Sequence, residues 1–139
     1  LFVKRSHASY YIPRAGIMKK KDWSFRMSDT FFVSLSPSQA ANRIQEGIVR
    51  GSITGELIDS YSISTKEGYS VSVLLFEKHY YRAGNRLTLT VTIDDFTGKT
   101  RVHTASGGGG EGLFRFDWGA SESFARSAKD ILKAYIIYP

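Results

Sequence analysis

Residues 86–106 of the chain read RLTLTVTIDDFTGKTRVHTAS. From Leu87 to Ile93 an apolar side chain alternates with a threonine, and the alternation continues into Asp94. Strict alternation over this length predicts a strand with one buried face and one face in water. Because the threonine face is polar, we expect any helix that covers this strand to lie on the opposite, apolar side.

The same stretch predicts a hairpin. Thr97-Gly98 can close a two-residue turn, which sets the pairing of a following strand over 99–106. This register places Ile93 opposite Val102 on the inner face and Asp94 opposite Arg101 on the outer face. Apolar groups then meet apolar groups and opposite charges meet, whereas a slip of one residue would move charge into the core.

Three further strands are expected before this hairpin, over residues 31–35, 53–64 and 69–82. In the second of them, Leu57, Tyr61 and Ile63 are expected on one face together with Ile53. Between the first two strands, residues 37–50 have the apolar spacing of an amphipathic helix.

Strong terminal signals mark this helix. Ser36 is placed to cap it, Pro37 suits the first helical position, and Gln39 completes a capping box. Gly51 is expected to end the helix in the left-handed conformation.

Residues 107–136 read GGGGEGLFRFDWGASESFARSAKDILKAYI. The glycine-rich run is expected to end the preceding strand as a loop, and 113–116 to form a short edge strand. Asp117 is expected to cap a final helix. One face of this helix carries the apolar residues Phe124, Ala128, Ile131, Leu132 and Tyr135.

The resulting order is strand, helix, four or five strands, helix. We therefore expect a two-layer α+β domain with a curved antiparallel sheet, paired as a meander and covered on one face by a long C-terminal helix. Residues 29–139 are expected to form this single domain. Residues 1–28 are expected to be a basic N-terminal arm, flexible or non-native, with Leu1, Met18 or Met27 as the native start.

Composition narrows the class of protein. The 139 residues suit one domain, and the absence of cysteine excludes disulfides and thiolate metal sites. The net charge of +6 is confined to residues 1–26, where seven Lys or Arg side chains oppose one Asp. No run approaches the roughly 20 apolar residues of a membrane helix, and the N-terminus lacks a secretory signal, so we expect a cytoplasmic protein without membrane contact.

The stretches FFVSLSPSQA, GSITGELID, VLLFEKHYYRAGNRLTLTVTIDD and SGGGGEGLFRFDWGASESF resemble those of a small bacterial family of unknown function, over about residues 27–137. This resemblance implies one compact domain and carries no activity with it. The element order also resembles the helix-grip domains (TBP-like or Bet v 1-like), in which a curved antiparallel sheet wraps a C-terminal helix. That likeness implies a ligand cavity between helix and sheet.

Two histidines are candidate functional residues. His79 and His103, with Glu77 or Asp94, could bind a metal or act as acid and base. A three-residue loop at Ala83–Asn85 would turn Glu77 and His79 inward. A loop of two or four residues would instead turn Phe76 and Tyr80 inward, leaving His79 in water and Lys78 on the inner face. Their spacing matches no metal motif, and no metal site is expected.

Other candidates involve basic, aromatic and glycine residues. The stretch 78–82, KHYYR, with Tyr81 and with Arg101 and His103 nearby, could stack bases of a nucleic acid. Trp118 at the final helix start is expected to cover the sheet. A phosphate could be held by the glycine-rich loop, although Glu111 would repel it. The loop residues are Gly107, Gly108, Gly109, Gly110, Glu111 and Gly112.

These observations favour a non-enzymatic binding or protein-interaction module, since no catalytic constellation is present and no cofactor is indicated. Two alternatives are a carrier of small apolar ligands of the helix-grip kind and a nucleic-acid binder that uses the basic arm and residues 78–82; nucleic acid is the less favoured partner. An unguarded edge of the sheet also suggests self-association into a homo-oligomer.

Overall fold

A computed structural model describes residues 28–51, 54–80, 85–108 and 118–138 of the chain. The expected edge strand over 113–116, the Asp117 cap and almost all of the N-terminal arm lie outside these ranges. The described elements are, in chain order, β1 (Ser28–Val33), α3 (Pro37–Arg50), β2 (Gly55–Ser64), β3 (Ser70–Tyr80), β4 (Asn85–Asp94), β5 (Thr100–Gly108), α4 (Trp118–Ile131), the 3-10 helix η3 (Lys133–Tyr135) and β6 (Ile136–Ile137).

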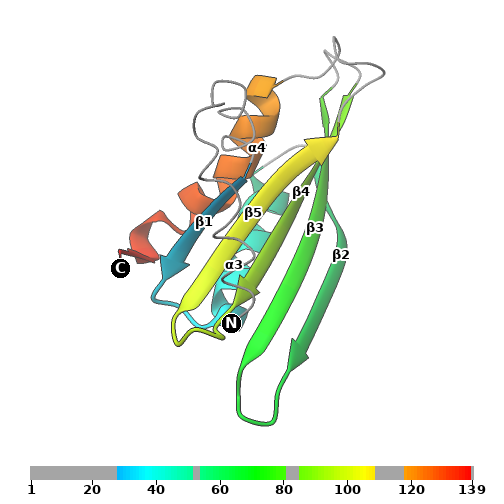
Figure 1. Ribbon diagram of the computed structural model, residues 1–139. Helices are drawn as coiled ribbons and strands as arrows, with labels where there is room; N and C mark the ends of the chain where they lie inside the picture. The colour runs from blue at the N-terminus through cyan, green and yellow to red at the C-terminus, as the bar shows by residue number, and fades with distance from the viewer. Residues whose placement is uncertain (1–27, 52–53, 81–84, 109–117, 139) are drawn as a thin grey trace, which may run out of the picture.

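The strands of the described residues form one open antiparallel sheet in the order β2-β3-β4-β5-β1-β6 (Figure 1). The α+β class and the meander from β2 to β5 are therefore confirmed. The last strand, β6, was not expected from the sequence. It is only two residues long and pairs with Phe32 and Val33 of β1.

The β4–β5 pairing confirms the predicted register. Ile93 lies opposite Val102, and Asp94 lies opposite Arg101. The turn itself differs from the predicted two-residue loop, because Gly98 N–H donates to the carbonyl of Asp95 at 3.0 Å. Gly98 has φ 93°, which glycine adopts without strain.

The start of α3 also agrees with its sequence. The Ser36 side chain accepts from Gln39 N–H, and the Gln39 side chain accepts from Ser36 N–H, which completes the capping box. The helix ends at Gly51 as expected. The prediction of a left-handed conformation there is wrong, since the φ angle of Gly51 is −83°. Space is the reason for glycine here, because a Cβ at Gly51 would lie 2.6 Å from the carbonyl oxygen of Gly47.

Both helices lie on the same side of the sheet (Figure 1). α3 packs over β2, β3 and β4, while α4 packs over β1, β4 and β5. Each helix has 14 residues, so the expected cover of one face by a long C-terminal helix is not confirmed.

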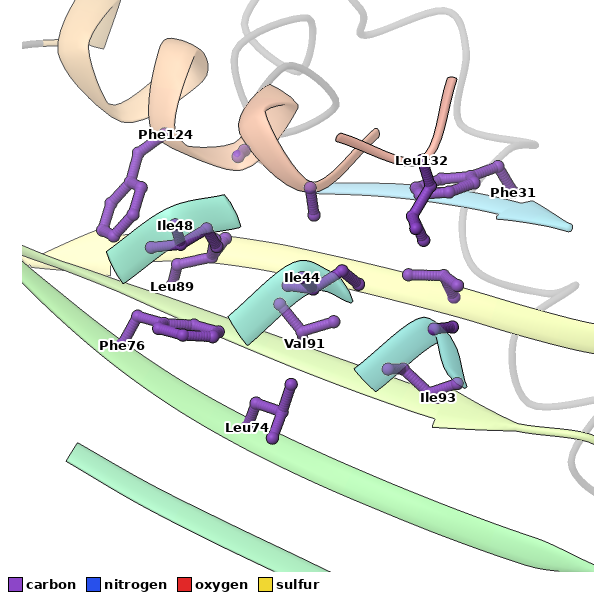
Figure 2. Packing of buried hydrophobic residues seen from close by; sticks show 14 of the residues in the cluster. Phe31, Ile44, Ile48, Leu74, Phe76, Leu89, Val91, Ile93, Phe124 and Leu132 are labelled. Carbon is purple, nitrogen blue, oxygen red and sulfur yellow. The ribbon is translucent and has the colours of Figure 1, made fainter. Parts of the chain in front are cut away.

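The core lies between the helices and the inner face of the sheet. Figure 2 shows Ile44 and Ile48 of α3 lying over this face, with Phe124 and Leu132 beside them. The inner side chains of β4 are Leu87, Leu89, Val91 and Ile93, each fully buried. The alternation of apolar and threonine residues therefore sets the side of β4 that the helices cover.

A β-bulge in β2 overturns one predicted face. The register shifts between Leu57 and Asp59, so Leu57 packs against the core while Tyr61 and Ile63 project from the outer face. Leu57 lies opposite the buried Phe76, whereas Tyr61 lies opposite Val73. These side chains therefore do not share a face.

The glycine-rich run begins later than expected. Gly107 and Gly108 belong to β5 and pair with Thr88 and Leu87. Gly108 has φ 101°, and a Cβ there would lie 2.6 Å from the Arg86 carbonyl oxygen. Close approach of two strands thus requires glycine at this position. Neither described helix is long and apolar enough to cross a membrane.

Candidate functional site

A pocket of about 230 Å³ opens between the end of α3, β3 and α4. The α3 wall consists of Gly47, Ile48 and Gly51, and β3 contributes Lys78. Ile48 is buried, so this wall is apolar at its base. Gly47 lies in the last turn of α3 and Gly51 ends the helix, and the C-terminal end of a helix carries a partial negative charge.

The position of Lys78 in the pocket follows from the β3–β4 register. Phe76 lies opposite Leu89 and Lys78 lies opposite Leu87, on the helix-covered face of the sheet. Of the two registers allowed by the sequence, the structure therefore has the one that turns Lys78 inward. On the other neighbouring strand, β2, the residue opposite Lys78 is Gly55, which has no side chain to fill the space beside Lys78.

The α4 wall combines an aromatic ring with polar groups. It consists of Ser123, Phe124, Ser127, Asp130 and Ile131. The Lys78 Nζ atom lies 5.8 Å from the centre of the Phe124 ring, a distance at which a cation–π attraction acts. Asp130 follows six positions after Phe124, about 9 Å further along the helix. The pocket lining thus includes a cationic side chain beside Phe124 and an exposed acidic residue further along α4.

Close contact between the helices bounds the pocket. A Cβ at Gly47 would lie 2.6 Å from the Cδ1 atom of Ile131, so the Ile131 side chain of α4 packs directly against the backbone of α3 at Gly47. The Ser127 hydroxyl donates to the Phe124 carbonyl at 2.6 Å, which leaves its oxygen able to accept a hydrogen bond from a ligand.

Glu77 and His79 lie on the outer face, away from this pocket, as the parity of β3 requires. Glu77 forms an ion pair with Arg86 at 3.6 Å. The backbone carbonyl of His79 accepts a hydrogen bond from the Thr54 hydroxyl at 2.9 Å. The two residues therefore share a face, but that face is the open side of the sheet.

His103 also projects from the outer face, as predicted. Its Nδ1 atom lies 2.7 Å from the Thr30 hydroxyl oxygen. Burial lowers the pKa of His103, Asp29 opposes this change, and Arg101 adds to it. Arg101 itself is held by two hydrogen bonds to Asp94. His103 and Arg101 are neighbours on β5, whereas His79 lies two strands away on β3.

The basic and aromatic stretch 78–82 does not form one surface in its described part, because Lys78 faces the helices and His79 faces water. Tyr81, the side chain of Trp118, and the loop residues Gly109, Gly110, Glu111 and Gly112 lie outside the described part of the chain. Within the described ranges, no three His, Asp or Glu side chains gather as metal ligands would.

The sequence alone does not identify the pocket residues as one group. Lys78 gave a signal, because the alternation of β3 placed a lysine on an otherwise apolar face. Asp130 and Ser127 gave none, since both read as the wet side of an amphipathic helix. The pocket depends on where α3 and α4 meet, and local sequence patterns do not specify that contact.

A comparison with curated proteins gives no match to this chain. A comparison with protein families gives a match that runs from the first residue of β1 to the first residue of β6. The match covers residues 28–136, and the chain belongs to this family of unknown function (DUF6054).

Proposed function

We propose that this domain is a non-enzymatic binding module that holds a small zwitterionic molecule of the amino-acid type in the pocket between α3, β3 and α4. The observation that carries the proposal is the inward-facing Lys78, a half-buried cation beside the fully buried Leu87. Lys78 Nζ lies 5.8 Å from the centre of the Phe124 ring, and an ammonium group has three N–H donors, so a ligand carboxylate would add a charge-assisted hydrogen bond to the contacts that Lys78 already has.

Another part of the pocket suits a ligand amine. Asp130 lines the pocket, and the last turn of α3, at whose end the helix dipole is negative, forms another wall of it. The apolar part of the ligand would contact Ile48, Phe124 and Ile131. A volume of about 230 Å³ admits a molecule of this size.

Amide chemical shifts in an NMR titration test this proposal. Three groups of probes are compared: free L-amino acids, simple carboxylic acids and simple amines. We expect saturable shifts around Ile48 and Ser127 with amino acids, and weaker or no shifts with either partial mimic. Lys78→Met and Asp130→Asn should each weaken binding at least about tenfold, because each removes one charged contact.

Arg126→Gln provides the matched control, since Arg126 is an exposed α4 residue outside the pocket lining. Its binding should equal that of the unmodified chain. Shifts that are equally strong in the Lys78→Met variant, or absent for every amino acid, would show that the pocket is not such a site.

A further inference from the structure

The strand β2 forms one edge of the sheet, and a neighbouring turn shows which of its backbone groups face outward. Thr65 N–H donates to the carbonyl of Tyr69 at 2.8 Å, so Thr65 turns its backbone towards β3. Successive residues of an antiparallel strand turn their backbone groups to alternate sides. Ser60, Ser62 and Ser64 therefore direct N–H and C=O groups away from β3, towards the open edge.

Exposed apolar side chains accompany this edge. Tyr61 is 58% exposed and Ile63 is 51% exposed, both on the outer face. Tyr69, at the end of the β2–β3 hairpin, packs edge to face against Phe96, with 6.1 Å between the ring centres. Both side chains are also exposed. In Figure 1 this hairpin extends beyond the ends of the neighbouring strands. Residues 60–64 contain no lysine or proline, the residues that commonly guard an edge strand against pairing.

We propose that β2 pairs antiparallel with β2 of a second copy of this chain, around a two-fold axis at Ser62. The interaction is independent of the pocket described above. In this register Ser62 lies opposite the partner's Ser62, and Ser60 lies opposite the partner's Ser64. Each of these serines exchanges two backbone hydrogen bonds with its opposite residue, about six bonds in all.

The side chains favour this register and this partner. On the outer face, Tyr61 lies opposite the partner's Ile63, and the pair occurs twice because the axis is two-fold. The acidic half of β2, with Glu56 and Asp59, then runs beside the partner's Lys66. An axis at Tyr61 would make fewer bonds, because Ser64 would have to pair with Ile58 beside the bulge.

Introduced cysteines test the register directly, because the chain contains no native cysteine. Under oxidising conditions Ser62→Cys should form a covalent dimer, since directly opposite Cα atoms lie about 5.5 Å apart and a disulfide needs about 4.4–6.8 Å. Ser60→Cys is the matched control. Its Cα atom would lie about 13 Å along the strand from that of the partner's Ser60, too far to cross-link.

A second variant tests the association without a cross-link. Ser62→Pro removes an outward N–H and the hydrogen bond between the Ser62 and Ser72 hydroxyls (2.8 Å). It leaves the backbone hydrogen bonds between β2 and β3 in place, so the monomer should keep its far-UV circular dichroism spectrum. Light scattering of the unmodified chain should give twice the 15.6 kDa of one chain, and Ser62→Pro should give 15.6 kDa. A monomer mass for the unmodified chain at every concentration would overturn the proposal, as would cross-linking of Ser60→Cys in preference to Ser62→Cys.

Discussion

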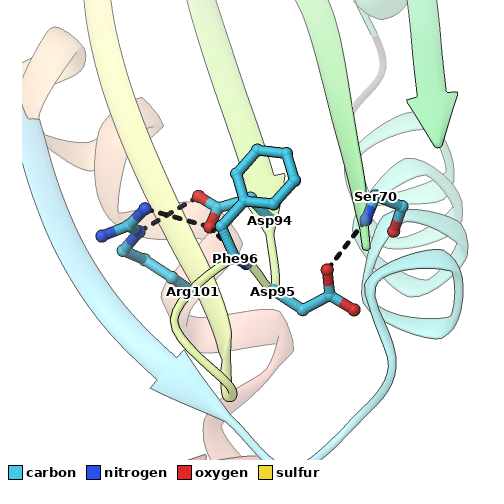
Figure 3. Close-up of polar contacts among 5 residues, drawn as sticks. All are labelled: Ser70, Asp94, Asp95, Phe96 and Arg101. Atoms are coloured by element: carbon cyan, nitrogen blue, oxygen red, sulfur yellow. Dashed lines mark hydrogen bonds and ion pairs between the residues drawn. The ribbon is translucent and has the colours of Figure 1, made fainter. Parts of the chain in front are cut away.

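Arg101 and Asp94 join β4 and β5 through two side-chain hydrogen bonds, each 3.0 Å long (Figure 3). Asp94 Oδ1 also accepts from Phe96 N–H at 3.1 Å, so one carboxylate fixes both the partner strand and the start of the turn. Asp94 is almost completely buried although it lies on the outer face, because Arg101 and the turn cover it. Next to it, Asp95 accepts from Ser70 N–H at 2.8 Å and joins the same turn to β3.

Replacing Asp94 by alanine should lower the free energy of unfolding by about 2 kcal/mol, because it removes charge-assisted hydrogen bonds from a buried position. Asp94→Asn should cost less, since its amide oxygen can still accept from Phe96 N–H. Urea denaturation at neutral pH measures both variants. Equal stability of Asp94→Ala and the unmodified chain would mean that solvent screening cancels the contribution of this pair.

The β4–β5 hairpin and the start of α3 were predictable because their determinants are local. Alternating threonines fixed the buried face of β4, and the pairing of Asp94 with Arg101 left one acceptable register. Ser36, Pro37 and Gln39 defined the helix start within four residues. In each case, neighbouring residues carry both the signal and the contact that satisfies it.

The remaining features depend on contacts between distant parts of the chain. The bulge after Leu57 turns Tyr61 and Ile63 outward, and nothing within β2 shows where the extra residue falls. β6 forms only because Ile136 and Ile137 meet β1. The pocket at Lys78 needs α3 and α4 to touch at Gly47, a contact determined by the packing of both helices on the sheet.

Thr104 is a fully buried residue on the inner face of β5, and its hydroxyl has no hydrogen-bond partner among the described residues. An unsatisfied buried hydroxyl is destabilising. Thr104→Val keeps the shape and removes this polar group, so it should raise the free energy of unfolding by about 1 kcal/mol. Thr104→Ser keeps the hydroxyl and loses a buried methyl group, so it should lower stability by about 1 kcal/mol. The opposite order in denaturant titrations would show that the hydroxyl is satisfied.

His103 should make stability depend on pH in mildly acidic solution. Burial lowers its pKa below the ordinary 6.5, so just below pH 6.5 the unfolded chain binds more protons than the folded chain. The contribution is complete above pH 6.5 and is lost as the pH falls towards the folded-state pKa. His103→Gln should remove this part of the decline, and the effect should be small because His103 is only partly buried. Thermal unfolding of both chains at a series of pH values from 7.5 to 5 measures this effect. If the unfolding temperature falls equally with pH in both chains, His103 has no role in the decline.

The adjacent glycines at the end of β5 should respond differently to the same substitution. Gly108 has φ 101°, and a Cβ there would lie 2.6 Å from the Arg86 carbonyl oxygen, so Gly108→Ala should cost about 1–3 kcal/mol. A Cβ at Gly107 would lie 3.9 Å from the Thr88 hydroxyl oxygen, and φ is ordinary. Gly107→Ala should therefore be neutral or slightly stabilising, because alanine reduces the entropy of the unfolded chain. Both variants lose one glycine, so the difference between their denaturation midpoints reports the strand geometry at Gly108 alone. Equal midpoints would place Gly108 outside the β4–β5 ladder.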